Sequence, residues 1–92
     1  MASGADHPVI VEFFGPFRMF GKERDLDVPG AIAYGRLVEM LGAELGSEFA
    51  EQAGKKNTTV IVNNRIVSRS KLELLQIEPG DKVAFALLLG GG

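Results

Sequence analysis

The amino-acid sequence predicts a single α+β domain in which one helix lies across one face of a mixed β-sheet. Three observations support this fold class. β-Branched and aromatic residues gather at 9–14 and 58–62, an amphipathic pattern spans 33–45, and a turn at 78–81 leads into an apolar last segment. Ninety-two residues with 46% hydrophobic content are enough for one hydrophobic core and leave no room for a second domain.

The first elements are two strands and the connection between them. Residues 9–14 have the composition of a buried strand. A glycine-bounded connection follows at 15–21, and 22–28 alternates apolar and charged residues, as a half-exposed strand does. The two strands are expected to pair as a hairpin, which Pro29-Gly30 ends.

The periodicity then changes from that of a strand to that of a helix. Within 33–45 the apolar residues recur at i, i+3, i+4, i+7 and i+11, so they share one helical face. A second, shorter helix is predicted at 48–53, with Ser47 as its N-cap and Gly54 at its end.

The second half of the chain reads as short strands and turns. Asn63-Asn64 can adopt the positive φ of a tight hairpin between a strand at 58–62 and a return at 65–67. Residues 68–75 show no regular pattern. Glu78-Pro79-Gly80-Asp81 is a turn with proline and glycine where a turn needs them.

These elements divide the chain into three parts. Residues 1–8 are expected to be a disordered N-terminal lead-in, and 9–89 form the folded domain, whose last strand covers 82–89. Residues 90–92 are expected to be a flexible C-terminal tail.

Composition argues against several classes of function. Without cysteine the chain has no disulfide, thiolate metal site or cysteine nucleophile, and its one histidine, His7, lies in the polar lead-in, so no metal site is expected. A net charge of −2 with scattered basic residues argues against nucleic acid as a partner. No apolar stretch reaches the roughly 18 residues of a membrane span, and no leader pattern opens the chain, so we expect a cytoplasmic protein that does not bind membranes. Without an acid–base pair or a nucleophile cluster, no catalytic residue of its own and no independent enzymatic activity are expected.

The terminal Gly90-Gly91-Gly92 is the candidate functional segment. Glycine lacks a Cβ, so another protein's backbone or active-site walls can approach it closely. Three extended glycines span at most about 10 Å, which suffices to thread a carboxylate from a folded sheet into a narrow site. Taken alone, the triglycine is equally compatible with a frayed end or a cloning remnant.

Several motifs together resemble the ubiquitin-like β-grasp fold, and most closely its sulfur-carrier branch. That branch includes the small subunit of molybdopterin synthase and the thiamine-pathway sulfur carrier. The motifs are the first strand ending in Phe13-Phe14, the helix after Pro29-Gly30, the hairpin at 60–64, the run at 78–83 and the terminal Gly91-Gly92. The resemblance covers nearly everything from Val9 to Gly92 and implies a sheet of four to five strands.

The features that distinguish the branches favour the molybdopterin pathway, with the thiamine pathway as the alternative. The long first hairpin and the 92-residue length resemble the molybdopterin branch. Two features depart from the pattern. Leu87-Leu88-Leu89-Gly90 stands where that branch usually has prolines and a small residue, and Asn63-Asn64 stands where Asn-Gly is more usual.

The resemblance implies a function for the Gly92 carboxylate. An E1-like adenylating enzyme would use ATP and Mg²⁺ to convert it into an acyl adenylate, and a sulfurtransferase or other sulfur donor would displace AMP to leave a thiocarboxylate. Gly90 and Gly91 would thread the tail, and the large subunit of a synthase would be a further partner. The chain would bind no cofactor itself. Two alternatives are a ubiquitin-like modifier conjugated through Gly92 and a β-grasp interaction domain whose glycines are incidental.

Docking to such partners needs exposed apolar side chains. The sequence offers Phe17, in the first connection, and Leu88, which strand alternation places on the face opposite Leu87 and Leu89. Packing in the core explains either side chain equally well, because most large apolar side chains are buried. Phe17 and Leu88 are the candidate partner-docking residues.

Overall fold

The computed structural model describes residues 7–87. The first six residues of the expected lead-in, the docking candidate Leu88 and the tail Gly90-Gly91-Gly92 lie outside the described residues. The strands are β1 (Val9–Phe13), β2 (Glu23–Leu26), β3 (Ile32–Ala33), β4 (Thr58–Val62), β5 (Arg65–Val67), β6 (Gln76–Ile77) and β7 (Lys82–Leu87). The helices are the 3₁₀-helix η2 (Gly15–Phe20) and the α-helices α1 (Tyr34–Leu45), α2 (Ser47–Ala53) and α3 (Arg69–Leu72).

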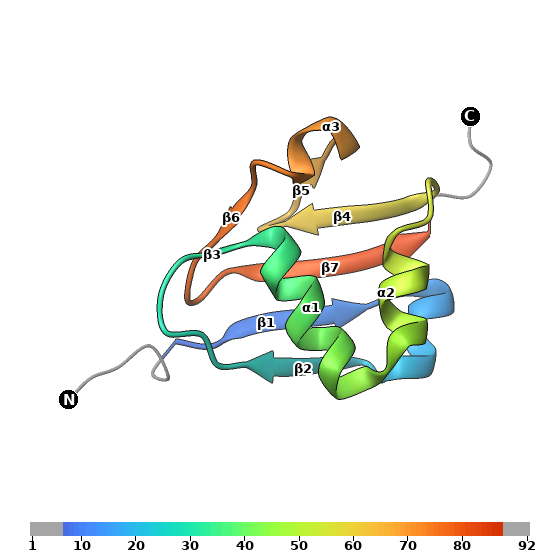
Figure 1. Ribbon diagram of the computed structural model, residues 1–92, viewed down its shortest axis with the longest axis horizontal. Helices are drawn as coiled ribbons and strands as arrows, with labels where there is room; N and C mark the ends of the chain where they lie inside the picture. The colour runs from blue at the N-terminus through green and yellow to red at the C-terminus, as the bar shows by residue number, and fades with distance from the viewer. Residues whose placement is uncertain (1–6, 88–92) are drawn as a thin grey trace.

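The main sheet has five strands in the order β2-β1-β7-β4-β5, which confirms the predicted mixed sheet (Figure 1). β1 pairs with β2 antiparallel and with β7 parallel, and β4 pairs antiparallel with both β7 and β5. β7 is therefore the central strand. Its Phe85 lies opposite Phe13 on one side and Val60 on the other, and all three side chains are buried.

A second, two-stranded sheet was not predicted. β3 and β6 pair antiparallel, with Ile32 opposite Ile77, and the backbone N–H of Tyr34 donates to the carbonyl of Leu75 over 3.0 Å. Two-residue strands are too short for alternation to be visible in the sequence. The same region, expected to be irregular at 68–75, also contains the single helical turn α3.

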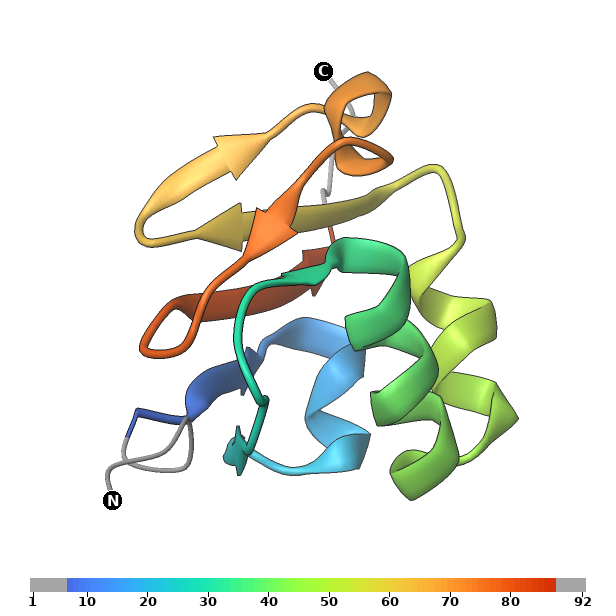
Figure 2. The ribbon, with the colours of Figure 1, turned by 60° about the vertical axis from the view of Figure 1, so that its left-hand side comes forward.

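The helices α1 and α2 cover one face of the main sheet (Figures 1 and 2). α1 confirms the predicted amphipathic helix, and its Leu37 and Leu41 are fully buried. Gly46, with φ +103°, ends α1 and is also the N-cap of α2. The prediction of Ser47 as the N-cap is therefore wrong. Ser47 is already the first helical residue, because a glycine at positive φ turns the chain between two helices without a linker.

An aromatic cluster holds η2 and α2 against the end of the sheet where β7 finishes. The ring centroids of Phe49 and Phe85 are 5.1 Å apart at 84°, and those of Phe20 and Phe49 are 5.4 Å apart at 81°, which are edge-to-face contacts. Phe17 lies 5.6 Å from Phe85. The segment expected to be a connection at 15–21 is thus mostly a 3₁₀-helix that contributes side chains to the core.

Two turns are joined at the opposite end of β7. Asn63 and Asn64 have φ of 50° and 70°, which confirms the predicted hairpin. The Asn63 side chain donates to the Asp81 carboxylate over 3.0 Å and accepts from the backbone N–H of Lys82 over 2.9 Å. Asp81 also accepts from the N–H of Glu78 over 2.9 Å. The β4–β5 hairpin therefore holds the turn from which β7 begins.

Because of Tyr34, the free energy of unfolding of this protein should vary with pH in the alkaline range. Burial raises the pKa of Tyr34 to about 12 from its ordinary value of 10.0, and the nearby positive charge of Arg69 opposes this in part. Between these two values the unfolded chain has lost the phenolic proton and the folded chain still holds it. The free energy of unfolding should therefore fall by about 2 to 3 kcal/mol across this window, and this loss should be absent below the unfolded pKa.

Chemical unfolding on both sides of this window, for the wild type and Tyr34→Phe, measures the loss. The variant should lose the part of the decline that comes from Tyr34. Because the chain has one tyrosine and no tryptophan, phenolate absorbance reports Tyr34 alone. Equal losses of stability in the two proteins would contradict the assignment.

Candidate functional site

The candidate site is the place where the chain leaves the sheet. β7 is paired on both sides as far as Phe85, which lies opposite Phe13 of β1, and its last two residues pair with β4 alone, where Leu87 lies opposite Thr58. β7, whose last residue is the last one described, therefore ends in the middle of the sheet, at the right-hand side of Figure 1. We call the surface formed here by Phe14, Gly15, Lys55, Lys56 and Leu87 the exit end.

β1 stops at the exit end and folds back at once. The N–H of Phe14 donates to the carbonyl of Phe85 over 2.9 Å, and Arg18 donates through Nε to the carbonyl of Phe13 over 2.9 Å. Gly15 then turns the chain at φ +58° into η2. A Cβ at Gly15 would lie 3.9 Å from the Cβ of Leu87, an ordinary contact, so the backbone conformation rather than the space favours glycine.

The other side of the exit end is the loop between α2 and β4. The hydroxyl of Thr58 donates to the carbonyl of Gln52 over 2.6 Å, and Arg69 donates to the carbonyls of Lys55 and Gly54 over 2.8 and 3.3 Å. These donors add side-chain hydrogen bonds to carbonyls at the end of α2 and just beyond it, where a positive charge is also favourable. The loop that carries Lys55 is therefore held in place from two directions.

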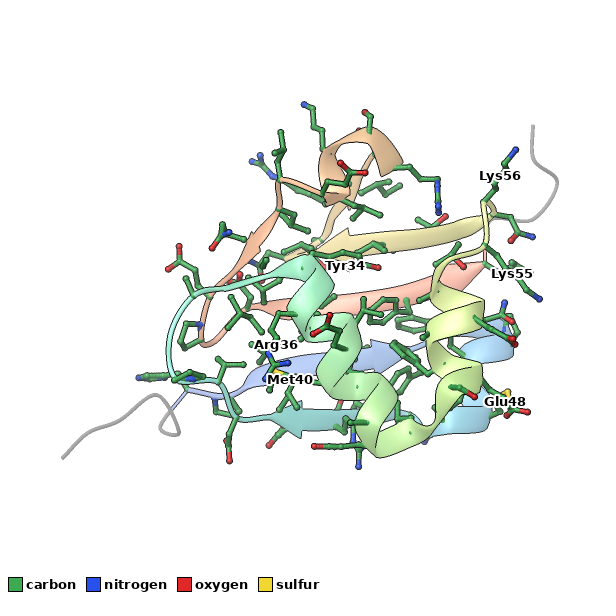
Figure 3. All side chains as sticks on the ribbon, in the orientation of Figure 1. Tyr34, Arg36, Met40, Glu48, Lys55 and Lys56 are labelled. Atoms are coloured by element: carbon green, nitrogen blue, oxygen red, sulfur yellow. The ribbon has the colours of Figure 1, made fainter. Side chains whose placement is uncertain are left out.

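The exit end carries positive charge, and acidic side chains lie beside it. Figure 3 shows Lys55 and Lys56 at the same end of the molecule as the end of β7. Lys55 also lines a shallow pocket of about 200 Å³ between η2 and α2, together with Met19, Glu48 and Glu51. Within residues 7–87 there is no group of three histidine or acidic side chains that could hold a metal ion. No helix in this range is long and apolar enough to cross a membrane. The described part of the exit end therefore provides a fixed position for the end of β7 and the positive charges of Lys55 and Lys56.

A second surface adjoins the exit end on the sheet face opposite α1 and α2. Alternation from the buried Val60 and Phe85 places Ile61 and Ala84 on that face, and the register puts them directly opposite each other. Phe14, whose extended backbone continues β1, is 42% exposed. Ile61 is half-buried, and the small side chain of Ala84 is buried. We call Phe14, Ile61 and Ala84 the open face, of which Phe14 and Ile61 are the accessible part.

The structure contradicts one of the two docking candidates. Phe17 is fully buried, with its ring 6.0 Å from that of Phe49, so it belongs to the core and not to a docking surface. The reason is that η2 turns its one fully apolar side inward against α2 and β7. Leu88 lies outside the described residues, so its docking role stays a prediction, as do the roles of Gly90, Gly91 and Gly92.

The open face was missed by sequence reasoning, although a signal for it was present. The two-residue turn at 63–64 sets Ile66 opposite Ile61. Because Val60 belongs to the core, alternation puts both isoleucines on the uncovered face. Counting the register back from the turn would have found this face.

A mixed sheet with parallel first and last strands at its centre, a helix across it and a last strand leading towards a diglycine define a ubiquitin-like β-grasp carrier. The particular family follows from comparison with known families. The model of the ThiS family matches residues 11–92, and the chain belongs to this family of sulfur carriers. Its members are small carrier proteins rather than enzymes, which confirms the expectation of a non-catalytic protein.

Comparison with solved structures supports the fold. The crystal structure of the thiamine biosynthesis protein ThiS from Geobacter metallireducens is similar to this chain with a TM-score of 0.55 and 20% sequence identity. The match covers 91% of this chain and 100% of that one. No curated protein matches the sequence significantly. The family model that matches is that of ThiS, whereas length and the first hairpin had suggested the molybdopterin branch.

The burial of Phe17 predicts the effect of removing its side chain. Phe17→Ala should lower the free energy of unfolding by about 3 to 5 kcal/mol, because it leaves a cavity between η2 and β7. Met19→Ala is the matched control on the same helix. Met19 is 67% exposed, so this change should cost no more than about 0.5 kcal/mol. Urea unfolding measures both free energies. An unchanged stability of Phe17→Ala would contradict the burial of Phe17 in the core and make it a docking candidate again.

Proposed function

We propose that the chain is the sulfur carrier of a thiamine-type pathway and carries its sulfur as a thiocarboxylate on Gly92. The observation that carries this proposal is the match to the ThiS family over residues 11–92, a range that includes the glycine tail. The similarity in fold to a thiamine biosynthesis protein supports the choice of pathway. We propose that the carrier works in the cytoplasm, as the sequence led us to expect.

The chemistry divides between the tail and an adenylating partner. A carboxylate is a poor electrophile, so the partner would join the Gly92 carboxylate to AMP from ATP and release pyrophosphate. A sulfur nucleophile would then attack the acyl carbon, the bond to AMP would break, and AMP would leave. With hydrogen sulfide ion as nucleophile the products are a thiocarboxylate, AMP and a proton. Mg²⁺ and cationic groups of the partner would stabilise the charge that develops.

The folded body contributes a fixed starting point for the tail. Leu87 pairs with Thr58 of β4, and β7 is paired on both sides up to Phe85, two residues earlier. The five residues from Leu88 to Gly92 can span at most about 17 Å when extended. The reacting centre of any partner must therefore come within about 17 Å of Leu87, so the partner has to dock on the surfaces around the exit end.

We place the adenylating partner on the open face. This face offers the apolar side chains of Phe14 and Ile61, which no helix covers, and Phe14 belongs both to it and to the exit end. A partner seated on Phe14 and Ile61 would have its active site within reach of the tail. Lys55 and Lys56 beside the exit would favour an acidic border on the partner, because opposite charges steer association.

The sulfur-transfer step is tested by mass. The wild-type chain, incubated with ATP, Mg²⁺, the adenylating enzyme and sulfide, should gain one sulfur in place of one oxygen, located at Gly92 by fragmentation. Fragmentation is needed because oxidation of Met1, Met19 or Met40 adds nearly the same mass. Deletion of Gly92 should abolish the change, and Gly91→Val should slow it by obstructing the passage of the tail.

Each alternative has a distinct outcome. Thiocarboxylation of Gly91→Val at the wild-type rate would contradict threading. Absence of sulfur at Gly92 would contradict the proposal. High-mass conjugates that disappear with Gly92 would indicate a protein modifier. A strain that lacks the chain should recover with thiamine, and loss of molybdenum-enzyme activity instead would contradict the pathway.

The docking of the adenylating partner is tested by Phe14→Ala. Truncation of a central aromatic contact should lower the efficiency of adenylate formation by about 5- to 30-fold, equivalent to 1 to 2 kcal/mol. Met19→Ala, which removes an exposed apolar side chain outside the open face, is the control and should have no effect. Equal efficiency of adenylate formation by Phe14→Ala and the wild type would contradict docking of the partner on the open face.

A further inference from the structure

The sheet edge formed by β5 carries a groove that the proposed function does not use. The groove is open, has a volume of about 630 Å³, and lies between β5 and the segment from α3 towards β6. We call it the edge groove and define it by Arg65, Ile66, Lys71 and Leu74. Ile66 and Leu74 are 74% and 83% exposed, the two most exposed large apolar side chains of the described residues. Large apolar side chains exposed together indicate a surface that binds something.

The backbone of β5 is open to pairing along this edge. β5 pairs with β4 and is the last strand of the main sheet (Figure 1). A two-residue turn closes on a hydrogen-bonded pair, here Val62 and Arg65, and the pairs then alternate along the hairpin. The N–H and C=O of Ile66 are therefore directed away from β4. An exposed strand edge with free donors and acceptors is a template for an added strand.

The charges around the groove indicate which charge an added strand should carry. From Arg65 to Leu75 the chain has three basic residues and one acidic residue, Glu73, in a protein whose net charge is −2. The Arg69 guanidinium is bound to the carbonyls of Lys55 and Gly54. Among the described ion pairs, none involves Arg65 or Lys71. The groove therefore presents two cations beside two apolar side chains.

This combination disfavours a second copy of the chain as the occupant. Two edge grooves brought together would place the basic residues of one copy close to those of the other, and like charges across paired strands are destabilising. An acidic strand meets opposite charge instead. Alternating side chains of such a strand would point in turn to the apolar pair and to the cations, as strand periodicity requires.

We propose that the edge groove binds an extended acidic segment of a partner protein by strand addition to β5. The backbone of the segment would pair with Ile66, an apolar side chain would lie between Ile66 and Leu74, and carboxylates would face Arg65 and Lys71. β4 separates β5 from β7. A partner bound here leaves the end of β7 free, so the carrier can be held by one protein while its tail is used by another.

The test uses the full chain and two synthetic peptides of about eight residues, a usual length for a strand. One alternates glutamate with valine, and the other has lysine in place of glutamate. In titrations followed by amide resonances, the glutamate peptide should shift signals of β5 and of Lys71 to Leu74, and the lysine peptide should not. Added salt should weaken the binding.

Variants separate the contributions of charge, backbone and apolar contact. Arg65→Glu with Lys71→Glu should weaken binding of the glutamate peptide by more than about tenfold, and the matched reversal Lys22→Glu on the far side of the sheet should leave it unchanged. Ile66→Pro removes the free N–H and should abolish binding, whereas Ile66→Val should retain it. Leu74→Ser, at an exposed position with no packing to lose, should weaken binding without affecting the fold.

Several results would overturn the proposal. These are equal binding of the two peptides, shifts confined to the open face, and no effect of the charge reversal. Shifts that depend on protein concentration without peptide would indicate a second copy as the occupant. Binding to acidic phospholipid vesicles but not to the peptide would indicate a membrane surface. Sulfur transfer to Gly92 should be unchanged in the Arg65→Glu, Lys71→Glu variant, so the two proposals stand or fall separately.

Discussion

The parallel pairing of β1 with β7, closed on the other side by β4, is the constraint on which the rest of the structure depends. It places the last described strand in the centre of the sheet, where Val83 and Phe85 are fully buried. β7 cannot shift without opening both of its ladders and the core beneath it. In the proposed function, the tail that has to reach into a partner would thereby start from a point that is fixed in the sheet.

Both ends of β7 are fixed by contacts outside the ladders. At its start, Asn63 and Asp81 connect the turn before β7 to the β4–β5 hairpin. At its other end, the aromatic rings around Phe85 draw η2 and α2 onto the sheet, and Arg69 holds the loop beyond α2. The exit end is therefore built from elements distant in the sequence. Edge strand β5 lies outside this arrangement, which leaves it free for a separate contact.

The regular elements of this fold follow from local patterns. The helical period of α1, the β-branched residues of β4 and the positive φ of Asn63 and Asn64 are each set by neighbouring residues, and each is observed as predicted. The failures arise where tertiary contacts decide. Phe17 is buried because α2 lies beside η2, and β3 and β6 form because two connections meet. No local pattern contains that information.

The functional site divides in the same way. The glycine tail and the family motifs are visible in the sequence, whereas the exposed surfaces depend on register. Ile61 lies on the uncovered face because the strand register places it there, and Ile66 is exposed because β5 is the last strand. The central claim is that the body acts as an unchanging support as far as Leu87. Amide hydrogen exchange of β7, compared between the free chain and its complex with the adenylating enzyme, tests this most directly. We expect the residues from Val83 to Phe85 to exchange only by global unfolding in both states. Faster exchange of β7 in the complex, with β1 and β4 still protected, would show that the strand detaches to feed the tail and would contradict the account.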